Sequence, residues 1–111
     1  MRKEAAVLIG LALAGLALAA SPAAHAIGSG SAAVGIKEFT FAPAALQVRP
    51  GTIVTWTNHD EETHTITSTT GAFGSSGLGN DETFAQTFSR AGTYEYFCAL
   101  HPRMRATVIV Q

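Results

Sequence analysis

The sequence predicts an all-β fold in which two antiparallel sheets pack as a β-sandwich. Short segments rich in β-branched and aromatic residues alternate with turn residues, and no segment has helical periodicity. A chain of 111 residues is long enough for one small domain. We expect about seven strands, at residues 34–41, 45–48, 52–58, 64–68, 83–88, 93–98 and 105–110.

Alternation along the expected strands indicates which side chains face the core. In residues 93–98, Glu95 requires solvent, so Tyr94, Tyr96 and Cys98 should point inward. In residues 52–58 the same reasoning makes Trp56 a core residue. The face opposite Cys98 should carry residue 97 as an exposed aromatic side chain.

The first expected strand does not keep one parity. Val34 and Ile36 alternate on one face, whereas Phe39 and Phe41 fall on the other. An extra residue in a strand shifts the alternation in this way, so we expect a β-bulge near residues 37–38.

The N-terminal residues have the three parts of a secretory signal peptide. Arg2 and Lys3 precede an apolar run over residues 5–20, and a small-residue cleavage sequence ends at Ala26. We therefore expect residues 1–26 to be a signal peptide, residues 27–32 a flexible tail and residues 33–111 the folded domain. A retained membrane anchor is the alternative, although the run is shorter than the roughly 20 residues that span a bilayer.

Charge argues against nucleic acid as a partner. The chain has seven basic and eight acidic residues, and loss of Arg2 and Lys3 with the signal would make the mature protein more negative.

The only cysteine lies in a short segment with an imidazole and a thioether. Cys98, His101 and Met104 follow one another at steps of three. Two imidazoles, one thiolate and a weak axial thioether form the ligand set of blue-copper sites, and His64 is the candidate second imidazole. Alternation in residues 64–68 places His64 on one face with Ile66. A lone cysteine could instead be an inert buried residue or an intermolecular bridge.

Four segments resemble the cupredoxins: FTFAP at 39–43, VRPGTIVTWTN at 48–58, HT at 64–65, and AGTYEYFC at 91–98 continuing to HPRM at 101–104. The two-residue gap between His101 and Met104 is similar to the amicyanin type, which is related to pseudoazurins and plastocyanins. The resemblance implies a cupredoxin-like Greek-key sandwich that binds one copper ion through His64, Cys98, His101 and Met104.

The same resemblance implies a periplasmic blue-copper protein that shuttles single electrons by Cu(I)/Cu(II) cycling and is not an enzyme. Its partners would be redox proteins, such as a c-type cytochrome or a periplasmic dehydrogenase. The mature protein would be a monomer without stable membrane insertion.

Two positions depart from the family pattern. Many relatives have an asparagine after the first ligand histidine, whose side chain braces the ligand loop, whereas this chain has Thr65. Ala106 stands where a glycine often follows the axial methionine. The Thr65 backbone amide can still approach the Cys98 sulfur, and neither change removes a ligand.

Several alternatives remain open at this stage. A periplasmic copper carrier or storage protein could use the same ligands, and a zinc-stabilised binding module could use the two histidines and the cysteine. An oxidase domain would need more copper ligands than the histidine count provides. His59 and the acidic residues 60–62 could form a second cation site, but we interpret them as a solvated turn.

Overall fold

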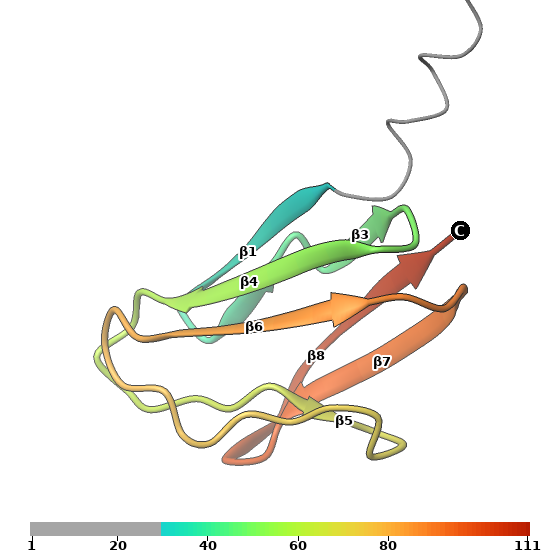
Figure 1. Cartoon of the computed structure of the whole chain (residues 1–111). Coiled ribbons are helices and arrows are strands. Elements are labelled where there is room, and N and C mark those ends of the chain that lie inside the picture. The colour runs from blue at the N-terminus through green and yellow to red at the C-terminus, as the bar shows by residue number, and fades with distance from the viewer. Residues whose placement is uncertain (1–29) are drawn as a thin grey trace, which may run out of the picture.

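The computed structural model describes residues 30–111, which form two sheets packed face to face (Figure 1). The strands in chain order are β1 (Ser31–Lys37), β2 (Thr40–Ala42), β3 (Ala45–Val48), β4 (Thr52–Asn58), β5 (Thr67–Ser68), β6 (Thr83–Phe88), β7 (Gly92–Cys98) and β8 (His101–Val110). The predicted β-sandwich is confirmed, and the expected bounds of β3, β4 and β6 agree with the structure.

The sheets are mixed, so the expectation of wholly antiparallel sheets was wrong. One sheet has the order β2-β1-β4-β6 and the other β3-β8-β7-β5. β1 pairs with β4 in parallel, and β3 pairs with β8 in parallel. The turn at Pro50-Gly51 joins β3 to β4, which belong to different sheets, so this turn crosses the sandwich and does not make a hairpin. Turn residues reveal where the chain reverses but not which strand becomes its neighbour.

The break of parity in the first segment comes from a hairpin and not from the expected bulge. β1 ends at Lys37 and β2 begins at Thr40, and these two residues are paired. Glu38 and Phe39 form the turn between them, with φ angles of 53° and 59°. The segment therefore gives two strands, so residues 30–111 contain eight strands and not the expected seven.

The N-terminal boundaries can be compared only in part. β1 begins at Ser31, so residues 31 and 32, which we expected in the tail, are paired with β4. The expected signal peptide at residues 1–26 lies outside the described residues.

An aromatic core fills the space between the sheets. Trp56 and Tyr96 are fully buried, and their ring centroids lie 5.5 Å apart in an edge-to-face arrangement. The Phe41 ring also contacts Tyr96, with 4.8 Å between the ring centroids. The strand parity predicted for Trp56, Tyr96 and Cys98 is confirmed, since all three are fully buried. Cys98 thus lies at one end of this core, two residues beyond Tyr96 on β7.

The face opposite Cys98 is less open than expected. Phe97 is half-buried, and the Arg105 guanidinium lies 5.5 Å from its ring centroid. Residues 97 and 105 are cross-strand partners on β7 and β8, so a cation–π contact covers part of the ring.

In the part of the chain that the structure describes, no helix is long and apolar enough to cross a membrane.

Core packing should dominate stability. Ile36 is fully buried in β1, whereas Ile53 on the neighbouring β4 is 46% exposed. We expect Ile36→Ala to lower the free energy of unfolding by about 2–5 kcal/mol, because it removes buried methyl groups and leaves a cavity. The matched Ile53→Ala should change it by only about 0.5 kcal/mol. Urea unfolding of the metal-free protein measures both, and equal effects would contradict this description of the core.

Candidate metal centre

The β7–β8 hairpin positions two of the expected ligands. Cys98 ends β7, His101 begins β8, and the two residues are cross-strand partners across a turn of Ala99 and Leu100. We expected a loop between the strands at 93–98 and 105–110, but the chain forms a tight hairpin here, with a register shift between residues 97 and 98. The Cys98 side chain is fully buried and that of His101 is half-buried.

His64 reaches the same point from the segment between β4 and β5. It forms an isolated antiparallel bridge with Leu78, in which each backbone amide donates to the other residue's carbonyl, at 3.1 and 2.7 Å. The expected strand at 64–68 is therefore shorter, with only Thr67 and Ser68 in β5. The imidazole is fully buried, as its predicted inward face requires.

The three side chains form a cluster suited to a metal ion. The Nδ1 atoms of His64 and His101 lie 3.7 and 3.6 Å from the Cys98 Sγ atom, and the donors of all three lie within 4.8 Å of one another. Donors that share one ion at about 2.0–2.3 Å each lie about 3.6–3.8 Å apart. The two separations between the sulfur and the imidazole nitrogens fit that requirement.

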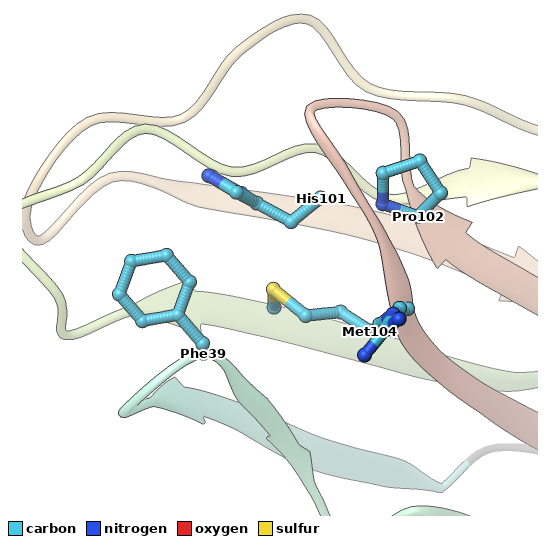
Figure 2. A pocket seen from close by; sticks show the side chains of 5 residues that line it. Phe39, His101, Pro102 and Met104 are labelled. Atoms are coloured by element: carbon cyan, nitrogen blue, oxygen red, sulfur yellow. The ribbon is translucent and has the colours of Figure 1, made fainter.

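Met104 lies beside the cluster on β8. Its side chain is only 6% exposed, and its sulfur points toward the space between the His101 and Phe39 rings (Figure 2). Phe39, His101 and Met104 line a shared, largely apolar pocket of about 440 Å³, together with Pro102 and Arg103. The thioether therefore shares this pocket with the His101 ring.

Asp60 connects the cluster to the neighbouring turn. Its Oδ2 atom accepts a hydrogen bond from His64 Nε2 at 2.9 Å and another from the Phe39 amide at 2.9 Å, while Oδ1 accepts from the Glu38 amide at 2.6 Å. A donor proton on Nε2 leaves the Nδ1 lone pair of His64 free to face Cys98, which is how carboxylates orient metal-binding histidines.

The hydrogen bonds also control the charge of Asp60. Burial acts to raise the pKa of this carboxyl group, but the amides of Phe39 and Glu38 and the His64 imidazole outweigh burial and lower the pKa below its ordinary value. Our interpretation of residues 59–62 as a solvated turn was wrong for Asp60, whose side chain is 11% exposed. The sequence signal for this role was a carboxylate four residues before His64.

Asn58 fixes the loop that carries Asp60 and His64. Its side-chain amide is fully buried, donates to the carbonyls of Glu62 and Leu78 at 2.8 and 2.9 Å, and accepts from the Asp60 amide at 2.9 Å. The role of Asn58 was not predicted from the sequence. The sequence did contain a signal for this role, because a polar side chain occupies the inward position of β4 two residues after Trp56.

Thr65 replaces the side-chain brace expected from an asparagine. Its backbone amide donates to Cys98 Sγ at 3.3 Å, and its hydroxyl accepts from the Ala99 amide at 2.8 Å. The Thr65 and Thr67 hydroxyls lie 2.8 Å apart, which fixes the orientation of the first. The departure at this position therefore keeps a link between the His64 segment and the β7–β8 hairpin.

The comparison with known families decides the relationship. The Cupredoxin-like domain matches residues 10–110 of this chain. The chain belongs to the cupredoxin family. It is 32% identical over 94 residues to amicyanin of Paracoccus denitrificans, covering 80% of this chain and 72% of that protein. It is 30% identical over 105 residues to amicyanin-alpha of Methylorubrum extorquens, covering 90% and 88%. The cupredoxin is thus of the amicyanin type, as its motifs indicated.

Solved structures agree with this relationship. A variant of amicyanin in its oxidised state superimposes with a TM-score of 0.70 at 30% identity, covering 74% of this chain and 83% of the other. A purple cupredoxin from Nitrosopumilus maritimus gives 0.68 at 31% identity, covering 72% and 99%. Two further amicyanin variants are Cu(I) forms. The predicted cupredoxin fold is confirmed, and the histidine–cysteine–histidine cluster is the part of this chain that could hold such an ion.

The Thr65 hydroxyl should hold the hairpin through the Ala99 amide. Thr65→Val keeps the side-chain shape but removes the acceptor, so we expect stability to fall by about 1 kcal/mol and the Ala99 amide to exchange roughly tenfold faster with solvent. Thr65→Ser, which retains a hydroxyl, should exchange like the wild type. Hydrogen exchange followed by NMR measures both variants, and a protected Ala99 amide in Thr65→Val would show that the brace is dispensable.

The lowered pKa of Asp60 predicts acid sensitivity. A carboxyl group whose pKa is lower in the folded state contributes stability above its unfolded pKa, near 3.8, and loses it as the pH falls through the lower folded value. We therefore expect Asp60→Asn to be less stable than the wild type at pH 6.5, with the difference shrinking below about pH 4. Urea unfolding of the metal-free proteins tests this, with Glu61→Gln, an exposed neighbour, as the control.

Proposed function

We propose that this chain is a mononuclear blue-copper protein that carries single electrons between redox proteins in the periplasm. In this proposal His64, Cys98 and His101 are the equatorial ligands and Met104 is the weak axial ligand. The observation that carries it is the preformed cluster, in which both histidine Nδ1 atoms lie 3.6–3.7 Å from a fully buried thiol.

The donor chemistry favours copper. A thiolate and a thioether are soft ligands, and two imidazoles complete the trigonal set with a long axial contact that is typical of blue-copper sites. Bound there, copper would supply a one-electron couple between Cu(I) and Cu(II). Zinc also accepts such ligands, but it is redox-silent, so a zinc site would leave the family's electron-carrier role without a cofactor.

The cluster is built to change little during a redox cycle. His64 is held by its backbone bridge to Leu78 and by a hydrogen bond from its ring to Asp60. The Cys98 sulfur accepts a hydrogen bond from the Thr65 backbone amide. Donors that are already in place need little rearrangement when the charge of the site changes. This property supports electron transfer more than metal delivery, because a carrier must release its ion readily.

One ligand is accessible to a partner. His101 is half-buried, and beside it Leu100 is 55% exposed and Pro102 is exposed. An apolar surface around a ligand edge suits the small, transient interfaces of redox encounters. We therefore propose that redox proteins, such as a c-type cytochrome or a periplasmic dehydrogenase, dock at this face, and that export by the expected signal peptide brings the protein to them.

Colour tests the metal assignment. We expect the copper-loaded, oxidised protein to absorb strongly in the visible region through sulfur-to-copper charge transfer, and Cys98→Ala to lose this absorption while remaining folded. Visible spectroscopy with circular dichroism on the same samples measures both properties. A colourless wild-type protein with one copper ion bound would refute the blue-copper assignment.

Electron-exchange kinetics distinguish an electron carrier from a protein that delivers or stores copper. The reduced protein should be oxidised rapidly and reversibly by a c-type cytochrome in stopped-flow mixing, and it should retain Cu(I) against a competing chelator over many cycles. Rapid loss of Cu(I) to the chelator, together with slow electron exchange, would instead support copper delivery or storage.

A further inference from the structure

Phe39 has a backbone conformation that side chains of its type rarely adopt. It is the second residue of the β1–β2 turn, and both turn residues have positive φ angles, 53° for Glu38 and 59° for Phe39. Turns of this kind normally place glycine at the second position. A strained residue persists only where its surroundings hold it, and such residues concentrate at functional sites.

Asp60 is the group that holds the turn. Its two carboxylate oxygens accept the amides of Glu38 and Phe39, at 2.6 and 2.9 Å. The Oδ2 atom that accepts the Phe39 amide also accepts His64 Nε2 at 2.9 Å. The position of Phe39 and the orientation of the His64 ring therefore depend on the same carboxylate.

The Phe39 ring lies against both imidazoles of the metal centre. Its centroid is 5.0 Å from that of His64 and 4.9 Å from that of His101, with interplanar angles of 86° and 82°. The two imidazole centroids are themselves 5.0 Å apart, so the three rings form a nearly equilateral triangle. Figure 2 shows the ring rising from the β1–β2 turn toward the His101 ring and the Met104 sulfur.

The two imidazoles differ in what else restrains them. His64 has Asp60 and its backbone bridge, whereas within residues 30–111 His101 has no carboxylate partner and lies at the edge of the pocket. Edge-to-face contact with Phe39 thus adds a second aromatic link between the half-buried His101 ring and the buried His64 ring, beside their direct contact. The ring is 44% exposed and still maintains both contacts.

We propose that Phe39 is a positioning residue that keeps the His101 imidazole in its metal-binding orientation before and after the metal binds. Asp60 acts through the turn: it holds Phe39 in its strained conformation, and Phe39 in turn limits rotation of His101. This inference rests on the proposed function, because it takes His101 to be a ligand. The packing of the three rings is nevertheless a property of the metal-free chain.

Phe39→Gly separates positioning from stability. Glycine suits the positive φ angle, so the metal-free variant should be as stable as the wild type or more stable. Loss of the ring should nevertheless increase side-chain motion of His101 and accelerate dissociation of Cu(I) about threefold to tenfold, given the strength of aromatic pairs. Phe39→Tyr retains the ring edge and should behave like the wild type.

Two controls complete the experiment. Ile53→Ala removes another half-exposed apolar side chain and should leave His101 motion and Cu(I) dissociation unchanged. Asp60→Asn should loosen both imidazoles, because the amide side chain cannot accept all three hydrogen bonds, whereas Phe39→Gly should loosen His101 more than His64.

The motion of each imidazole ring is measured independently of copper by NMR relaxation of its carbons. The sample is the metal-free protein at a pH where both rings are neutral. Unchanged His101 relaxation in Phe39→Gly would overturn the proposal. If the wild type fails to bind copper, the proposed function fails, and the relaxation data still decide the role of Phe39. Increased His101 motion without faster Cu(I) dissociation would also overturn it, because positioning would then not affect the bound metal.

Discussion

The Asp60 carboxylate is the constraint on which the centre depends most. It joins the β1–β2 turn to His64 by accepting the amides of the consecutive residues Glu38 and Phe39 and the ring N–H of His64. The Asn58 side chain accepts the Asp60 amide, so the loop after β4 is held by hydrogen bonds that do not involve the aromatic rings. A carboxylate satisfied by three donors stays ionised, and its negative charge then favours the His64 tautomer that exposes Nδ1 to the thiol.

The cluster joins segments that are far apart in the sequence. His64 comes from the segment between β4 and β5, whereas Cys98 and His101 come from the β7–β8 hairpin, and Thr65 bridges the two through the Cys98 sulfur and the Ala99 amide. The aromatic core on β7 leads directly to the thiol, because Tyr96 and Cys98 share one face. Folding therefore brings the donors together, and metal binding in turn should stabilise the folded chain.

Local pattern predicted the inward residues well and the long-range contacts poorly. Alternation placed Trp56, His64 and Cys98 correctly, because side-chain direction along a strand depends only on local parity. The roles of Asp60 and Phe39 could not be predicted in this way. They arise where the β1–β2 turn meets the loop after β4, and that contact follows from the parallel pairing of β1 with β4. Sequence alone gives no register for strands that pair in this non-local way.

The centre is asymmetric, and the asymmetry follows from where each imidazole is attached. His64 lies inside the sandwich with its second nitrogen satisfied by Asp60, so movement would break a charge-assisted hydrogen bond in a buried site. His101 begins β8 at the surface, and apolar contact with Phe39 restrains it without covering its whole edge. One imidazole of the cluster is thus fixed inside the sandwich while the other remains close to solvent.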